Sequence, residues 1–355
     1  MTDIYADGQL ATGSNNGTSW ADAYRGAAGL QSAFDAAVAA DVVHVARTFN
    51  LSVPIDVDQH SGTDGSPVRV VGYNYNGGSP VIDGTKAVID AADTAARCLN
   101  VSGVDHWRWE NLEFANATGD NVYAADYEDY HQFLRCDSHG AGGAGWSAAA
   151  NRHWRQGIWV YCRSYGNASG CGWDQLGYNT TLYGCSAIDN GSYGFSAIIS
   201  NCAFVGCVAH HNGDTGFRFG SANMAAIGCV SDGNTQHGFR ISYAALIARC
   251  RATNNGGYGL YADSATVTEL DNFYSGNGTA ATGGSTPLPD DKGASTRITS
   301  GAAGYENLAG DKLNLRLGAA GWRVESDMGG GNYLRTSVGL PTSIVPQIAK
   351  AGGRQ

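Results

Sequence analysis

The 355-residue sequence is poor in charge, in lysine and in long apolar runs. Charged residues make up 15 %, only four are lysines, and the net charge is −10. A nucleic-acid-binding protein needs a basic patch that displaces counterions, and no Lys/Arg cluster is present, so we expect no nucleic-acid partner. No apolar stretch reaches the roughly 18 residues of a membrane span, so we expect no membrane partner either.

Metal-ligand spacing is also missing. None of the nine cysteines forms a C-x-x-C pair, which is the usual spacing of a zinc or redox site. The acidic run Asp126–Asp129 lies in a predicted loop, where carboxylates are usually solvated. We therefore expect no cofactor, although Ca²⁺ stays open as the ion that carboxylate clusters bind.

A pattern of cysteine, asparagine, glycine and aromatic residues repeats every 21 to 26 residues. An Asn follows five residues after most of the cysteines, and a Gly–aromatic or Gly–Leu pair completes each unit. We extend the frame upstream to Asn111 with Asn116 and downstream to Asn272 with Asn277, which gives eight units. The three repeated positions are Cys136, Cys162, Cys185, Cys207, Cys229 and Cys250; Asn167, Asn190, Asn212, Asn234 and Asn255; and Trp146, Trp173, Phe195, Phe217, Phe239 and Leu260.

Each unit predicts one coil of a parallel β-solenoid. Apolar and small residues alternate in Ala203–Ala209 and again in Gly216–Phe219, which indicates two short strands per unit. Stacked coils lie about 4.8 Å apart, so that like residues lie above like residues. We expect the cysteines to form a buried core column, because free cysteine is among the most buried residue types. The asparagines would form a ladder of hydrogen-bonded amides.

Both ends of such a stack need a cover. Leu30, Phe34, Ala37 and Val38 share one helix face, which predicts a capping helix over roughly residues 29–40. The predicted organisation is an N-terminal strand and capping helix over 1–45, coils over 46–278, and a loop with a capping tail over 279–355. The alternating stretch Asp311–Leu317 predicts a strand in that tail, which can also serve contact with another subunit in a homo-oligomer.

The chain resembles the pectate-lyase-like superfamily of right-handed parallel β-helices. The residues that carry the resemblance are Ile4–Asp7, Thr12–Trp20, Pro80–Gly84, Tyr305–Leu317 and the Gly–aromatic coils with their Asn column. The resemblance implies an all-β, right-handed parallel β-helix. Members include polysaccharide lyases, polygalacturonases, bacteriophage tailspikes and plain binding proteins, so the fold does not choose the activity.

The same resemblance implies a substrate groove along one sheet. The residue after each inward aromatic should point outward, which gives Tyr123, Ser147, Asp174, Ser196, Arg218, Arg240 and Tyr261. Two guanidiniums one coil apart repel unless an anion lies between them. That anion is either an acidic sugar or a nearby carboxylate, Asp214 or Asp263, and both alternatives stay open.

A lyase reaction requires a cation at the uronate, a base and an acid. We assign these catalytic roles to His237, Arg218, Arg240 and Asp214, and substrate contacts to Asp174, Tyr261, Tyr123 and Trp154. Trp154 lies with Trp146 and Trp159 in the longest coil insertions, where exposed aromatic rings would stack on sugars. The paired aspartates and the Arg-Ile-Lys motif of polygalacturonases are missing around Asp214–Phe217 and Gln236–Ile241.

Three hypotheses follow. The first is a groove that binds and cleaves an acidic polysaccharide; the second is a non-catalytic phage virion or surface structural protein; the third is an adhesin module. Met1–Asp7 does not read as a signal peptide, and the N-x-S/T sites belong to the Asn column, so we expect an extracellular or virion protein from a bacterial or viral source.

Overall fold

The structure is a computed structural model of the chain. It describes residues 1–284 apart from 77, 78, 83, 84, 151, 264 and 266, and the backbone of three later strands. The chain divides into two compact units, Met1–Arg297 and Ile298–Gln355. In the second unit, β36 (Leu313–Gly318), β37 (Gly321–Ser326) and β38 (Thr336–Val338) form an antiparallel sheet.

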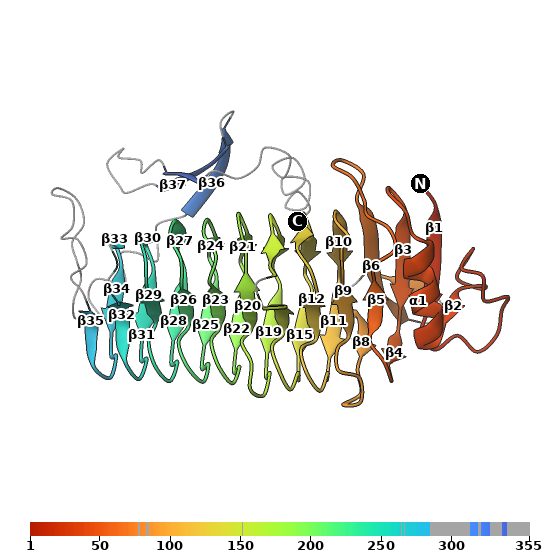
Figure 1. Cartoon of the computed structure of the whole chain (residues 1–355), viewed down its shortest axis with the longest axis horizontal. Helices are drawn as coiled ribbons and strands as arrows, with labels where there is room; N and C mark the ends of the chain where they lie inside the picture. Colours follow the sequence, from red (N-terminus) through yellow and green to blue (C-terminus); the bar gives the residue numbers. More distant parts are fainter. Residues whose placement is uncertain are drawn as a thin grey trace. The chain divides into compact units, whose positions relative to one another are not determined.

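The first unit is a parallel β-helix whose coils are stacked along one axis (Figure 1). Each complete coil contributes one strand to each of three sheets, not two strands as the alternation predicted. Sheet A runs in the order β2 (Tyr24–Arg25), β1 (Asp3–Asp7), β3 (Val42–Ala46), β6 (Val68–Asn76), β10 (Trp107–Glu110), β14 (Gln132–Leu134), β18 (Ile158–Val160), β21 (Thr181–Tyr183), β24 (Ala203–Val205), β27 (Met224–Ile227), β30 (Ala245–Ala248) and β33 (Val267–Leu270), with β7 (Ser79–Val81) antiparallel to β6.

Sheets B and C have ten successive strands each, so the stack exceeds the eight predicted units. Sheet B contains β4 (Thr48–Asn50), β8 (Ala87–Asp90), β11 (Leu112–Ala115), β15 (Asp137–His139), β19 (Arg163–Tyr165), β22 (Ser186–Ile188), β25 (Val208–His210), β28 (Val230–Asp232), β31 (Arg251–Thr253) and β34 (Phe273–Ser275). Sheet C contains β5 (Ile55–Val57), β9 (Leu99–Val101), β12 (Val122–Ala124), β16 (Trp146–Ala148), β20 (Trp173–Leu176), β23 (Phe195–Ala197), β26 (Phe217–Phe219), β29 (Phe239–Ile241), β32 (Tyr258–Ala262) and β35 (Ala280–Gly284).

A corner with positive φ separates sheet A from sheet B in successive coils. Gly206 occupies it in the stretch predicted as one strand, with φ of 62°. L-residues rarely adopt this left-handed backbone region, but glycine enters it without steric cost. The chain therefore turns between Val205 and Val208, and both Cys207 and Ala209 point into the core.

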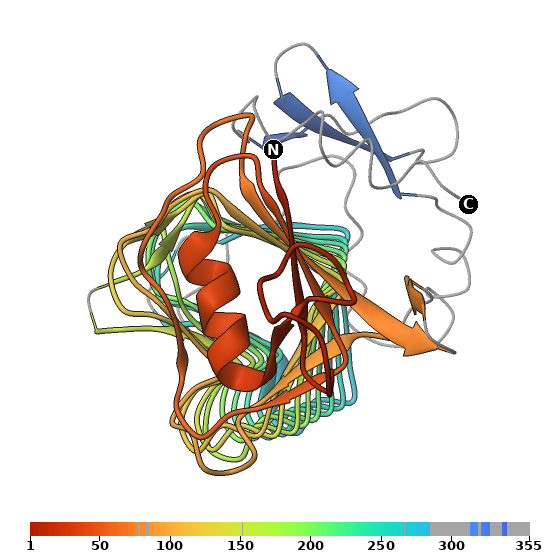
Figure 2. The same cartoon turned by 90° about the vertical axis from the view of Figure 1, so that its right-hand side faces the viewer.

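The capping helix is present, but it lies three to four residues earlier than predicted. Helix α1 (Gly26–Ala36) lies across the N-terminal end of the coils (Figure 2). Its Phe34 packs edge-on against Trp107 and Trp109, with ring centroids 5.9 and 5.6 Å apart. The prediction that Val38 belongs to the buried helix face is wrong, because Val38 follows the helix and is 45 % exposed.

The predicted tail over 279–355 lies mostly outside the described residues. Its first part, Ala280–Gly284, is strand β35 of the coil stack and not loop. The strand predicted over Asp311–Leu317 is confirmed as β36.

The asparagine column is a continuous ladder. The side-chain amide of each Asn from Asn167 to Asn255 donates to the amide oxygen of the next ladder Asn, at 2.7 to 2.9 Å. That oxygen also accepts the backbone N–H of the preceding Asn in four of the five steps, at 2.9 to 3.2 Å. The side-chain nitrogen also donates to a backbone carbonyl, as Asn212 does to Ala187 at 3.1 Å. Every buried amide group is thus satisfied within the column.

The upstream frame is wrong by one residue. β11 pairs with β15 through Glu113–Asp137 and Ala115–His139. This register places Leu112 in the cysteine column, where Asn111 was predicted. It places Ala117 in the asparagine column, where Asn116 was predicted. Asn111 and Asn116 instead hold corners with φ of 56° and 60°. Asparagine tolerates this conformation better than most residues. It therefore occurs both at these corners and in the ladder, and the predicted alignment assigned the two corner asparagines to the repeat.

The cysteine column is confirmed as a buried, reduced core stack, since all nine cysteines are buried and free. Burial raises the pKa of the Cys185 and Cys207 thiols well above the ordinary value. It also raises the pKa of Cys98, Cys171 and Cys202 to about 12. Thiols of this kind are inert, because the thiolate is the reactive form.

We predict that iodoacetamide leaves these cysteines unlabelled in the native protein and labels them after unfolding in guanidinium chloride. Mass spectrometry of the two samples measures the difference. Rapid native labelling of Cys185, Cys207 and Cys229 would contradict their place in the core.

We predict that Asn212→Ala lowers the free energy of unfolding by about 1–3 kcal/mol, because it leaves buried partners of the ladder unpaired. Chemical denaturation measures the loss. Thr235→Ala, an exposed position in the next coil, is the control and should change stability little. Equal effects of both substitutions would show that the ladder contributes nothing specific.

Candidate functional site: the outward face of sheet C

Strand register stacks the residues of the predicted column on sheet C, although Ser147 and Ser196 are buried, with 5 % and 0 % exposure. Asp56, Asn100, Tyr123 and Ser147 are successive partners, and so are Ser196, Arg218, Arg240 and Tyr261. Between the two runs, Asp174 follows Trp173 on β20, where a bulge at Gln175 shifts the register. The column therefore continues over consecutive coils with one irregular step.

Arg218 and Arg240 lie one coil apart but have different surroundings. Arg240 Nε lies 3.3 Å from the Asp263 carboxylate, which also accepts the Ser242 hydroxyl at 2.8 Å. Arg218 lies over the Tyr193 ring, 5.0 Å from its centroid, and forms no ion pair or hydrogen bond among the described residues. The carboxylate alternative thus holds for Arg240, while Arg218 has no direct ion pair and interacts with the Asp174 carboxylate only at longer range.

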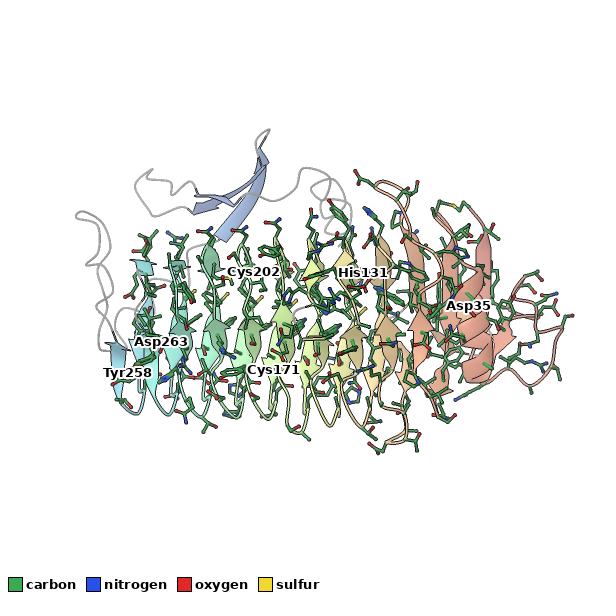
Figure 3. The ribbon with its side chains drawn as sticks, in the orientation of Figure 1. Asp35, His131, Cys171, Cys202, Tyr258 and Asp263 are labelled. Atoms are coloured by element: carbon green, nitrogen blue, oxygen red, sulfur yellow. The ribbon has the colours of Figure 1, made fainter. Side chains whose placement is uncertain are left out.

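Three aromatic rings adjoin this pair of arginines. His237 stacks on Tyr261 with centroids 4.7 Å apart and an interplanar angle of 12°, and Tyr258 lies 5.3 Å from Tyr261. Figure 3 shows Tyr258 and Asp263 toward the C-terminal end of the stack. Rings and cations together form the kind of surface that an acidic sugar requires, with ring faces for C–H groups and a cation for the carboxylate.

The imidazole of His237 is held in one tautomer. The backbone N–H of Tyr258 donates to Nδ1 at 3.1 Å, so a neutral ring carries its proton on Nε2. Burial, and then the charge of Arg240, lower the pKa of His237. His237 is therefore a hydrogen-bond donor at Nε2 near neutral pH, and its Nδ1 is not free to act as a base.

The two predicted carboxylates lie at the edges of this surface. Asp214 accepts the hydroxyl of Thr215 at 3.0 Å, in the turn before β26. Asp174 accepts the backbone N–H of Gln175 at 2.9 Å, and burial raises its pKa. Neither forms an ion pair with Arg218 or Arg240 among the described residues.

The predictions for Trp154 and Trp159 are wrong. Both side chains are 0 % exposed, and Trp154 Nε1 donates to the Ser147 carbonyl at 2.9 Å. The insertion forms β13 (Glu128–Asp129) and β17 (Trp154–Arg155), which extend sheet C beside β20, so Trp154 packs inward. Trp159 lies on β18 of sheet A, between Phe133 and Leu182. Trp146 and Trp173 are core residues, as their place in the aromatic column predicted.

The exposed ring of this insertion is Tyr127, which is 37 % exposed. The guanidiniums of Arg152 and Arg155 lie 4.9 and 4.7 Å from it. Arg155 is bound to Asp129 by two hydrogen bonds of 2.7 Å. Tyr123, in contrast, is covered by the guanidinium of Arg97 at 3.5 Å.

Sequence reasoning missed Tyr193 and Tyr258. Each stands two residues before an inward residue of sheet C, the same position that His237 occupies. A search of that column, and not only of the residue after the aromatic, would have found both.

Two wider features of the described residues bear on function. No three His, Cys, Asp or Glu side chains within this part of the chain gather closely enough to hold a metal ion. No helix in the same residues is long and apolar enough to cross a membrane.

Comparison with known proteins identifies the fold. A family model described as "Right handed beta helix region" matches residues 97–245. The solved pectate lyase Pel9A has 17 % identity and a TM-score of 0.61, with 84 % of this chain and 82 % of that chain covered. A rhamnogalacturonan lyase has 12 % identity and a TM-score of 0.57, with 82 % of this chain and 86 % of that chain covered.

An alginate lyase from a Paenibacillus species gives 15 % identity, a TM-score of 0.54, and coverage of 78 % of this chain and 97 % of that one. No curated protein matches the sequence. Identities this low establish the fold and not the activity. The chain contains the right-handed β-helix region of the family model, and its fold is that of the pectate-lyase-like β-helix proteins.

Proposed function

We propose that the outward face of sheet C binds an acidic polysaccharide, with Arg218 as the group that neutralises a sugar carboxylate. The observation that carries the proposal is the unpaired Arg218 guanidinium, which lies over Tyr193 and one coil from Arg240. Of the two cations only Arg240 has a direct carboxylate partner, Asp263, while Asp174 and Asp214 act on the pair at longer range, so the Arg218 guanidinium can contact a further anion directly. The three structurally similar lyases, by their printed names, act on pectate, alginate and rhamnogalacturonan, which supports this class of ligand.

Cleavage by β-elimination is the reaction that these residues would serve. A base takes the proton from C5 of the uronate, the electron pair forms the C4=C5 double bond, and the C4–O bond breaks with protonation of the leaving oxygen. His237 offers a hydrogen bond from Nε2 in its neutral form. Asp214, the nearby carboxylate, is then the candidate base that takes the C5 proton, and Tyr261, the phenol stacked against His237, is the candidate acid that protonates the leaving oxygen.

We predict that Arg218→Ala weakens binding of polygalacturonate or alginate about tenfold or more, since a charge-assisted contact is worth about 1.5–3 kcal/mol. The melting temperature should change little, because Arg218 forms no ion pair or hydrogen bond among the described residues and loses only its contact with the Tyr193 ring and a longer-range interaction with Asp174. Arg240→Ala should weaken binding and also lower stability through the loss of Asp263. Isothermal titration and thermal unfolding measure both effects.

The matched control is Arg251→Ala, an arginine on sheet B, which should leave binding unchanged. A stoichiometry and affinity unchanged from the wild type in the double variant Arg218→Ala/Arg240→Ala would end the proposal for this face. A wild-type chain that binds none of the acidic polysaccharides would favour the structural, non-catalytic hypothesis. If the wild type cleaves, Tyr261→Phe should remove turnover more than binding.

We predict that the imidazole of His237 titrates below the ordinary histidine pKa of about 6.5, so that it is neutral at pH 7. Arg240→Ala should raise the pKa, because it removes a nearby cation and frees the Asp263 carboxylate. Heteronuclear NMR titration measures the midpoint, and the ¹⁵N shifts report the proton on Nε2. A midpoint above 7, or a proton on Nδ1, would contradict the geometry described here.

A further inference from the structure

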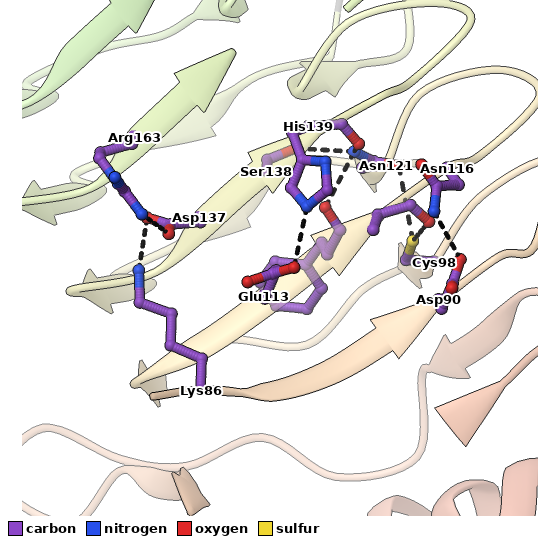
Figure 4. Close-up of polar contacts among 12 residues, drawn as sticks. Lys86, Asp90, Cys98, Glu113, Asn116, Asn121, Asp137, Ser138, His139 and Arg163 are labelled. Carbon is purple, nitrogen blue, oxygen red and sulfur yellow. Dashed lines mark hydrogen bonds and ion pairs between the residues drawn. The ribbon is translucent and has the colours of Figure 1, made fainter. Parts of the chain in front are cut away.

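A second group of polar and aromatic side chains lies on the outward face of sheet B. We call it the sheet B cluster, and its members are Lys86, Glu113, Asp137, His139, Arg163 and Tyr165. Strand register aligns Glu113, Asp137 and Arg163 in one column and places His139 beside Tyr165 in the next. The cluster thus spans three successive strands, β11, β15 and β19, with Lys86 directly before β8 (Figure 4).

One carboxylate in this cluster holds two cations. Asp137 is 1 % exposed and lies between Lys86, with Nζ at 2.5 Å, and Arg163, whose Nε donates at 3.0 Å. The Arg163 side chain is nevertheless 56 % exposed. Asp137 alone does not offset both cations, but the Glu113 carboxylate also acts on Arg163 at longer range, so the cluster is close to balanced in charge and presents the Arg163 guanidinium to solvent.

Two stacked rings adjoin the exposed arginine. His139 stacks on Tyr165 with centroids 4.7 Å apart and an interplanar angle of 10°. The Arg163 guanidinium carbon lies 5.6 Å from the Tyr165 centroid. His139 Nε2 lies 2.9 Å from Glu113 Oε1, so this carboxylate contacts the imidazole directly and acts on Arg163 only at longer range.

The sheet B cluster repeats the arrangement found on sheet C. There too a histidine stacks at 4.7 Å on the tyrosine of the next coil, and an arginine beside the rings is paired with an aspartate. The sequence repeat does not impose this likeness. Outward positions of the two sheets are unrelated in the pattern, and neighbouring outward positions, such as Ile188 and Val208, are apolar.

We propose that the sheet B cluster is a second binding site for an acidic saccharide, a proposal that takes its ligand class from the function proposed for sheet C. The exposed Arg163 guanidinium binds the carboxylate, and the Tyr165 ring with His139 carries the sugar face. The coil outline is closed (Figure 2), so the outward faces of sheets B and C point in different directions. One molecule then holds two polysaccharide segments, which raises its avidity for a polymer.

The test uses isothermal titration with short oligogalacturonate and oligoalginate on the full chain. We expect two equivalents for the wild type and one for Arg218→Ala/Arg240→Ala. We also expect one for His139→Ala/Tyr165→Ala and none for the four substitutions combined. The control Ile188→Ala, the strand partner of Tyr165 on the next coil, should leave two equivalents.

The outcomes separate the two proposals. Unchanged stoichiometry in His139→Ala/Tyr165→Ala overturns the second site and leaves sheet C untouched. Unchanged stoichiometry in the sheet C variant, with loss in the sheet B variant, overturns sheet C alone. If the sheet B variant does not fold, the wild type decides: titrated oligosaccharide must shift the ring resonances of His139 and Tyr165, and no shift overturns the second site.

Discussion

The hydrogen bonds of the asparagine ladder hold successive coils in register, and the surface arrangement follows from that register. Each ladder amide from Asn190 to Asn255 donates to the next coil and to a backbone carbonyl, and its oxygen accepts from the preceding coil. A shift of one residue would leave these buried groups unpaired, at about 1–3 kcal/mol each. It would also turn outward side chains toward the core, because side chains alternate along a strand. Arg218 therefore lies beside Arg240 because Asn212 and Asn234 are bonded in the core.

The sequence was informative where burial constrains it. Inward positions face the same environment in every coil, so the positions equivalent to Cys207 and Phe217 hold similar residues throughout the stack. The coils from Cys136 to Cys250 could therefore be aligned from the sequence. Upstream of Cys136 the predicted alignment is shifted by one residue. Asn111 and Asn116 lie at corners with positive φ, a conformation that asparagine tolerates well, and not in the repeated columns. The corner between sheets A and B was not predicted. Its residues in successive coils, such as Arg135, Tyr161 and Gly184, share a positive φ but have no side-chain property in common.

Outward positions carry less information, and the site was predicted only in part. The column of Arg218, Arg240 and Tyr261 followed from the register, which the core residues fix. The position of Trp154 did not follow from the register, because Trp154 belongs to an insertion. That insertion forms an additional strand, β17, and the Trp154 side chain packs into the core outside the repeat pattern. Pairing was predicted only as alternatives: the sequence offered Asp214 and Asp263 as partners of the arginines, but nothing in the spacing chose Asp263 for Arg240.

The net charge of −10 sets a limit on how an acidic polymer can be recognised. At physiological salt the Debye length is about 8 Å, which exceeds the coil spacing of about 4.8 Å by less than a factor of two. A carboxylate on the ligand therefore senses the coil it touches and the next one or two, and the remaining acidic surface is largely screened. Recognition has to come from direct local contacts, as at the Arg218 guanidinium, which forms no ion pair of its own among the described residues and lies beside the Arg240–Asp263 pair. The rings of His237, Tyr258 and Tyr261 beside these arginines add aromatic faces that can pack against the C–H groups of a sugar, so the contact combines charge with apolar packing.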